Sequence, residues 1–213
     1  MTTRTEPITL SAALREHTAD AHQRAEESTF VVDLLAGRLS LDALVALLAQ
    51  SLPIYAALEE TCRAADSPIL APLLDPRLER TERLRADLAA HAAAGRRFET
   101  VVPSAEAYAA ELRSLADRPA ALLAHHYVRY LGDLSGGQVI ASLVQRHYGA
   151  DPGALTFYRF EIERPKVYKD DYRAQLDALP LNADQRSETL AAASRAFELN
   201  RSLFEELHQE FGR

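Results

Sequence analysis

One histidine near the amino terminus stands where it could bind a metal. His22 lies in a stretch whose apolar or small positions, among them Leu14, Thr18 and Ala25, repeat every three or four residues. That spacing places them on one helical face and leaves room beside the imidazole. Glu26, one turn later, could accept a hydrogen bond from the second ring nitrogen, as metal-binding histidines usually require. An ordinary surface pair has the same spacing, so both interpretations stand.

Three glycines interrupt a second helical stretch. Gly132, Gly136 and Gly137 fall inside the segment 119–148, which otherwise shows helical periodicity. Each interior glycine costs a helix roughly 1 kcal/mol relative to alanine, so the cluster needs a compensating role. A backbone without Cβ atoms lets a ligand lie directly on the helix, and it equally lets another helix cross closely. The glycines alone leave both alternatives open.

Charged and aromatic side chains surround these glycines. Arg129 and Asp133 are one turn apart, and Asp133 lies on nearly the same side as the last two glycines. A carboxylate beside bare backbone makes a polar pocket that can hold ordered water. Tyr127 and Tyr130 flank it. This composition favours a ligand site over a solvated helix surface.

Other metal and phosphate sites are excluded by their missing motifs. A di-iron bundle needs two Glu-x-x-His pairs, and only Glu205 with His208 fits. His-Glu-x-x-His, paired cysteines and the phosphate-binding Gly-x-x-x-x-Gly-Lys are absent. The neighbours His125 and His126 are about 100° apart on a helix and cannot easily share a metal. Cys62 is expected to be a small buried hydrophobic residue.

Composition indicates a globular chain in a reducing compartment. Of 213 residues, 47% are hydrophobic, which is enough for a core, and we expect one domain over 1–213 with a flexible terminus at 1–9. The formal charge of -7 argues against nucleic-acid binding. A single cysteine fits the cytoplasm. The longest apolar run, 43–49, is far short of the roughly 20 residues that span a bilayer, so we expect no membrane association.

Helical periodicity dominates the chain and predicts an all-α fold of about eight helices. Ser11, Ser40 and Ser104 are candidate N-caps, Pro53 should bend the helix that contains it, and Gly37, Gly95 and Gly149 should end helices. The predicted helical stretches are 11–28, 31–36, 41–65, 77–94 (exposed), 104–116, 119–148, 152–159, 165–178 and 183–210.

Two of these stretches resemble the heme oxygenase family. The segment 14–26, LREHTADAHQRAE, resembles the proximal helix, whose histidine binds the heme iron. The segment 130–138, YLGDLSGGQ, resembles the distal-helix signature, which is highly specific. Weaker similarity at 55–60, 157–158, 169–173 and 197–207 extends the resemblance over about 10–207. The fold it implies is all-α, with heme between the proximal and distal helices, as in soluble bacterial members.

The resemblance also implies a role for each matching residue. His22 would bind iron, with Glu26 as its hydrogen-bond partner, while Gly132 and Gly136 would approach the heme closely and steer oxygen toward a meso carbon. Asp133 would deliver protons through an ordered water, in a network with Arg129, Tyr130 and Tyr55. The remaining heme contacts would be Thr18, Ala25, Gly137, Phe197 and Asn200, and the propionate anchors Arg15, Tyr127, Lys169 and Arg173.

Some of these positions have simpler explanations. Lys169 and Arg173 could form a solvated basic face with the neighbouring Asp170 and Asp171, and aromatic residues at helical spacing more often belong to the core. Ala19 stands where some members carry a further lysine, which leaves the propionate clamp with fewer charges.

The implied reaction is the cleavage of heme b by O2 to biliverdin, CO and ferrous iron. No flavin or nicotinamide motif is present, so the electrons would come from a separate reductase or ferredoxin. We expect a monomer. The alternative is a non-catalytic heme carrier or sensor, which would need His22 and the propionate anchors but not Asp133 with its glycines.

Overall fold

The computed structural model describes residues 8–212, and this part of the chain contains helices but no strands. Its α-helices are α1 (Leu10–His17), α2 (Ala19–Glu26), α3 (Thr29–Leu35), α4 (Leu41–Ala64), α5 (Thr81–Ala93), α6 (Pro103–Ser114), α7 (Pro119–Tyr148), α8 (Pro165–Asp177) and α9 (Ala183–Phe211). Three short 3-10 helices are η1 (Ala71–Leu73), η2 (Pro152–Ala154) and η3 (Thr156–Tyr158). The all-α prediction is confirmed, with nine helices in the described range where about eight were expected.

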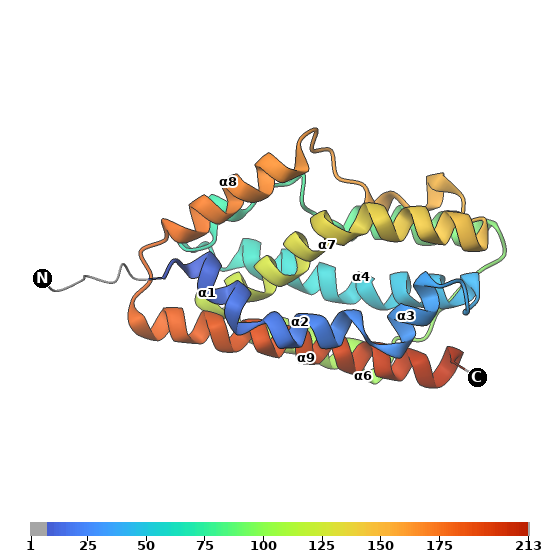
Figure 1. Ribbon diagram of the computed structural model, residues 1–213, viewed down its shortest axis with the longest axis horizontal. Coiled ribbons are helices and arrows are strands. Elements are labelled where there is room, and N and C mark those ends of the chain that lie inside the picture. The colour runs from blue at the N-terminus through green and yellow to red at the C-terminus, as the bar shows by residue number, and fades with distance from the viewer. Residues whose placement is uncertain (1–7, 213) are drawn as a thin grey trace, which may run out of the picture.

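Three long helices, α4, α7 and α9, run along the length of the molecule (Figure 1). α7 packs along α9, and α4 packs against α5 and α6. The short helices α2 and α3 also pack on α9, whereas α8 stands along the upper edge of the view. Buried side chains from all the long helices form one core cluster, which includes Tyr55, Tyr108 and Tyr130. Helices α2 and α7 therefore both pack on α9.

Helix α4 is the apolar centre of the fold. Within the described residues it alone is long and apolar enough to cross a membrane by length and composition, but most of its apolar window is buried by other helices. A helix that is buried in this way belongs to the core of the fold. Pro53 lies inside α4 and the helix continues through it. Cys62 is 2% exposed, as expected of a small hydrophobic residue.

Several predicted helix ends are confirmed by their capping geometry. The Ser40 hydroxyl accepts a hydrogen bond from the Ala43 amide and starts α4. Pro119 is the first residue of α7, where its missing amide hydrogen is not needed. Gly149 ends α7 with a φ of 63°, a left-handed conformation that favours glycine.

The prediction of one helix over 11–28, capped by Ser11, is wrong. Thr9 caps α1 by accepting a hydrogen bond from the Ala12 amide. The amide and hydroxyl of Ser11 instead donate to Asp177 of α8, at 2.7 and 2.8 Å. The helix then breaks at Thr18, whose hydroxyl donates to the Leu14 carbonyl and competes with the helical hydrogen bonds.

The predicted start at Arg77 is also wrong, because the Asp75 carboxylate captures the Arg77 amide in a turn and α5 begins only at Thr81. α5 is not an exposed helix, since it buries Leu84, Asp87 and His91. Ser104 is not an N-cap, because α6 starts with Pro103 after Val102.

The segment 152–159, predicted to be helical, forms two separate 3-10 turns. The buried Asp87 carboxylate explains this, because it accepts hydrogen bonds from the amides of Thr156 and Phe157 and from the Thr156 hydroxyl. Of the terminus expected to be flexible, residues 1–7 lie outside the described residues, and Thr9 caps α1.

The two adjacent buried histidines, His125 and His126, should make the folded protein less stable at acidic pH. Burial lowers the pKa of His125 to about 4 and that of His126 to about 3, whereas unfolded histidine titrates near 6.5. Below about pH 6.5 the unfolded chain therefore binds protons that the folded chain does not. Each histidine should lower the free energy of unfolding by about 1.4 kcal/mol per pH unit between roughly pH 6 and 4.

Urea unfolding across that pH range measures this slope. His126→Asn should reduce the slope by about 1.4 kcal/mol per pH unit, while His17→Asn, an exposed position on α1, should leave it unchanged. Equal slopes in the wild type and His126→Asn would contradict the assignment.

Candidate active site

The short helix α2 presents a histidine to solvent. The side chain of His22 is 54% exposed, and its Nδ1 lies 3.5 Å from Glu26 Oε2. The ring also meets the Phe197 ring of α9 edge-on, with centroids 5.7 Å apart. The contact with Glu26 occupies Nδ1 and leaves Nε2 as the nitrogen for a metal.

A polar cluster of buried and half-buried side chains lies on one side of α7. Asp133 is half-buried and accepts a hydrogen bond from the hydroxyl of Tyr55, which projects from α4. The Arg129 guanidinium lies 4.5 Å from the centre of the Tyr55 ring and donates to Asn200 Oδ1 at 2.6 Å. Burial raises the pKa of Asp133, although the charges of Arg129 and Arg80 and the Tyr55 hydrogen bond oppose that shift. The cluster joins α4, α7 and α9 around one carboxylate.

The imidazole on α2 and the cluster on α7 reach the same stretch of α9. His22 contacts Phe197, and Arg129 binds Asn200, three residues further along the helix. Residues three apart are neighbours on one face of a helix. α9 therefore brings together two groups that are more than 100 residues apart in the sequence.

The glycines of α7 divide into two kinds. Gly132 is exposed, and a Cβ atom there would meet no neighbouring protein atom within 4 Å. At Gly136 a Cβ would touch only Ile140 of the same helix, at 3.9 Å. Close crossing by another helix therefore does not explain these two glycines. It does explain Gly137, where a Cβ would lie 3.3 Å from the carbonyl oxygen of Tyr158.

Four basic or phenolic side chains predicted to act together lie around α8. Lys169 donates to the Ser135 hydroxyl of α7 at 3.0 Å, and Arg173 pairs with Asp170 at 3.1 Å. Burial raises the pKa of Tyr127, and the charges of Arg173 and Arg15 act against that rise. Tyr127, Arg173 and Arg15 are thus electrostatic neighbours although they belong to three different helices.

Two predicted residues have other bonding partners. The Tyr130 hydroxyl donates to Glu59 at 3.2 Å. Thr18 is buried with its hydroxyl on the Leu14 carbonyl, and Ala25 is half-buried on the same short segment. Thr18 therefore determines where α2 begins, whatever its own contact with a ligand.

Glu59 and Arg80 complete the surroundings of the cluster, and no role was predicted for either residue. Glu59 accepts hydrogen bonds from Tyr130 and from the amides of Arg80 and Thr81. Arg80 is 2% exposed and donates to four backbone carbonyls, those of Arg77, Leu78, Phe157 and Arg159. Glu59 is an acidic residue within the apolar helix α4 and falls in the segment 55–60 that resembles the family, whereas Arg80 has no short-range signal.

A family model identifies the chain. The model described as heme oxygenase matches residues 8–206, which is nearly the whole sequence. The chain belongs to the heme oxygenase family. The family predicted from the segments 14–26 and 130–138 is confirmed, and with it the activity of a heme oxygenase.

Individual relatives agree with this assignment. The heme oxygenase of Takifugu rubripes is 36% identical over 94% of this chain and 74% of its own length. Heme oxygenase 1 of a Synechocystis strain is 33% identical, over 94% of this chain and 85% of its own length. The crystal structure of heme oxygenase-1 from Synechocystis, in complex with heme, matches with a TM-score of 0.89 and 32% identity, covering 95% of this chain and 94% of that one.

The site of this heme oxygenase fits a flat ring with a metal centre. His22 offers an exposed imidazole, and Gly132 offers a helix surface without side chains. The Nε of Arg129 is buried and has no hydrogen-bond partner among the described residues. A donor of this kind suits an ordered water beside Asp133.

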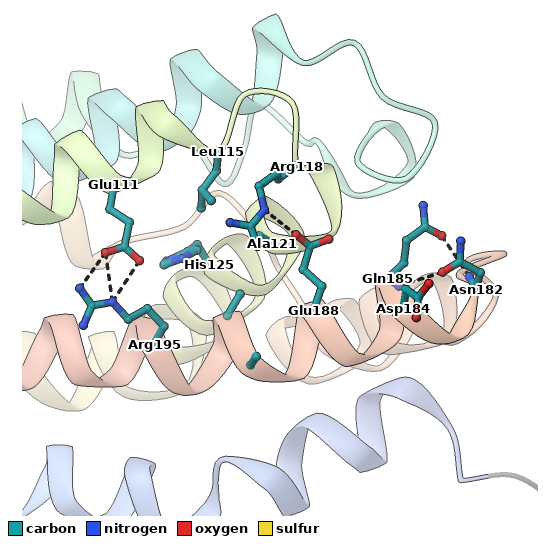
Figure 2. Close-up of a pocket in the computed structure, with 12 residues that line it drawn as sticks. Glu111, Leu115, Arg118, Ala121, His125, Asn182, Asp184, Gln185, Glu188 and Arg195 are labelled. Carbon is teal, nitrogen blue, oxygen red and sulfur yellow. Dashed lines mark hydrogen bonds and ion pairs between the residues drawn. The ribbon is translucent and has the colours of Figure 1, made fainter.

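A cavity of about 510 Å3 lies elsewhere in this heme oxygenase, on the side of α9 away from α1 and α2 (Figure 2). The residues that line it include none of those predicted for the heme site. Two ion pairs span it, Arg195 with Glu111 at 2.8 Å and Arg118 with Glu188 at 2.6 Å. These charges satisfy one another and tie α6 and the start of α7 to α9, which is a structural role.

Proposed function

We propose that this chain binds heme between α2 and α7, with His22 as the iron ligand, and cleaves it to biliverdin, CO and ferrous iron. The observation that carries the proposal is the meeting of His22 and Arg129 over one stretch of α9, at Phe197 and Asn200. This arrangement brings a nitrogen that can bind a metal and a cluster that can hold a proton to neighbouring positions along α9.

His22 acts as a neutral ligand. Glu26, whose Oε2 lies 3.5 Å from Nδ1, fixes the ring's orientation and tautomer. Phe197 supports the ring edge from α9. A neutral imidazole donates less electron density to the iron than a cysteine thiolate would.

On the α7 side of the proposed site, the helix surface carries no side chains at two glycines. Gly132 and Gly136 let the macrocycle lie directly against the α7 backbone. With heme bound there, Gly132 and Gly136 would leave little room between the ring and α7, and this confinement would favour oxidation of the ring itself. The iron supplies O2 binding and activation; the protein supplies the confinement.

Asp133 holds the proton supply. Burial raises the pKa of its carboxyl group, which eases proton uptake at its oxygens, and the Tyr55 hydroxyl and the Arg129 charge keep the group in place. A carboxylate that acts through an ordered water transfers a proton more mildly than a directly placed acid would.

The propionates of heme would bind the basic group around α8. Lys169 and Arg173 of α8 and Arg15 of α1 supply positive charges, and Tyr127 of α7 supplies a hydroxyl. The Ser135 hydroxyl of α7 already accepts a hydrogen bond from the Lys169 amine. Electrons would come from a separate reductase or ferredoxin. We further propose a cytoplasmic monomer that associates with neither nucleic acid nor membranes.

The test is turnover of bound hemin in air. Purified protein with one equivalent of hemin and a ferredoxin–reductase couple should lose the heme absorption band, form biliverdin and release CO that ferrous myoglobin captures. Stable heme absorption under these conditions would support the carrier or sensor alternative, and failure to bind hemin at all would overturn both.

Replacing Gly132 separates heme binding from folding. Gly132→Ala should raise the free energy of unfolding by roughly 1 kcal/mol, because the helix gains a better helix former and the new methyl group meets no protein atom. The same methyl group would occupy the surface of α7 that faces the heme, so biliverdin formation should fall at least tenfold. Urea unfolding and the hemin assay measure the two effects.

Gly137→Ala is the matched control on the same helix. Its methyl group would lie 3.3 Å from the Tyr158 carbonyl oxygen, so this variant should lose stability. Full biliverdin formation by a stabilised Gly132→Ala variant would show that the open glycine surface is not part of the heme site.

A further inference from the structure

Helix α8 carries two propionate anchors, yet it has little hold on the rest of the protein. Of its 13 residues only Tyr172 and Leu176 are buried. It stands along the edge of the molecule, away from α9 (Figure 1). Its position relative to α7 therefore depends on few contacts.

Tyr172 makes the buried polar contact between α8 and α7. Its hydroxyl and His126 Nδ1 are 2.8 Å apart, and the two rings stack at an angle of 8° with centroids 5.9 Å apart. His126 in turn meets the Tyr130 ring edge-on at 4.5 Å. The contact thus links α8 to the part of α7 that carries Arg129 and Asp133.

This link stays uncharged. Burial lowers the pKa of His126 to about 3 and raises the pKa of Tyr172 well above its ordinary value, so both are neutral at physiological pH. A hydrogen bond between two buried groups is costly to break, because each partner would be left without another. Such a contact therefore holds α8 in one orientation relative to α7.

The other ties of α8 reach different parts of the protein. Tyr168 donates to Asp75 at 2.9 Å, and Asp177 accepts from Ser11 of α1. Lys169 does bind Ser135 of α7, but its amine is the group a propionate would engage. With heme bound, the contact between Tyr172 and His126 would be the side-chain hydrogen bond that remains between α8 and α7 among the described residues.

We propose that His126 is a positioning residue for regioselectivity. Through Tyr172, which lies three residues after Lys169 and one before Arg173, it sets where the propionate anchors stand relative to the glycine surface of α7. That placement fixes the rotation of heme in its plane and so selects the meso carbon that is attacked. The inference rests on the proposed function.

The test is the isomer composition of biliverdin. Tyr172→Phe and His126→Phe both delete the hydrogen bond but keep an aromatic ring. Each should increase the fraction of minor isomers at least threefold, measured by chromatography, while the rate of heme consumption stays within twofold of the wild type. The double variant should shift the composition no further than either single variant, because both remove the same contact.

Three further variants make the result specific. His126→Asn keeps a polar atom near the position of Nδ1 and should restore the wild-type isomer composition. Tyr148→Phe, on α7 but bonded to the Leu34 carbonyl, also loses one hydroxyl contact and should leave the composition unchanged. Lys169→Ala combined with Arg173→Ala provides the reference for a disordered clamp.

Unchanged isomer composition in Tyr172→Phe, with the wild type active, would overturn the positioning role. Tyr172→Phe alone decides the matter if the His126 variants fail to fold, since it removes a single oxygen atom. A wild-type protein that forms no biliverdin would instead contradict the proposed function, so the two failures are distinguishable.

Discussion

His22→Ala is expected to abolish biliverdin formation. Without the imidazole the iron loses its protein ligand, because no other described histidine shares that position beside Phe197. The hemin complex should lose the absorption spectrum of histidine-ligated heme, and the rate of biliverdin formation should fall at least a hundredfold. Hemin titration and single-turnover assays measure both effects.

Imidazole added to His22→Ala should restore part of the spectrum and activity, since the exposed position of the ring leaves a small molecule access to the iron. His17→Ala removes an exposed histidine from the neighbouring helix α1 and serves as the matched control, with wild-type behaviour expected. Wild-type heme spectra in His22→Ala would eliminate His22 as the ligand.

Asp133→Asn should form biliverdin about a hundredfold more slowly, within the 10²–10⁴-fold range typical of a lost general acid. The amide can keep the contact with Tyr55 but cannot hold the proton. Heme should still bind and still react with oxygen, so that oxidant is consumed in peroxidase-like side reactions. Product analysis together with oxidation of an added phenol measures that diversion.

A loss of stability is not expected to account for slower biliverdin formation by Asp133→Asn. Burial raises the pKa of Asp133 in the folded state, so its ionised form lowers the free energy of unfolding at any pH above both pKa values. Asp133→Asn is therefore expected to be at least as stable as the wild type at pH 7. Asp184→Asn, in the first turn of α9, is the control for a carboxylate outside the site. Normal biliverdin yield from Asp133→Asn would refute its assigned role.

The presence of the long helices was predictable from the sequence. Their ends were predictable where the residue that caps the helix lies next to that end in the sequence. Ser40, Pro119 and Gly149 act within one turn of their own position, so their effect shows in the sequence. The errors at Ser11 and at 152–159 have a different origin. In both, a carboxylate distant in sequence, Asp177 or Asp87, binds the groups that would otherwise have capped or built a helix.

The residues predicted for the heme site divide in the same way. The spacing of His22 and Glu26 depends only on helical geometry, and their contact was predicted from it. The partners of Tyr130 and Arg129, by contrast, come from α4 and α9, 71 residues away in each case. Spacing along one helix carries no information about which other helix its side chains meet.

The sequence by itself determined an all-α chain, because helical periodicity is a local property, and the segments 14–26 and 130–138 carried its resemblance to the heme oxygenase family. Only the tertiary structure decided which glycines are open and which is packed: Gly132 faces no protein atom, and Gly137 lies against Tyr158. It also decided that His126 lies within hydrogen-bond distance of the Tyr172 hydroxyl. The physical reason is that side-chain packing between distant helices sets these contacts, and no periodicity within a single helix encodes it.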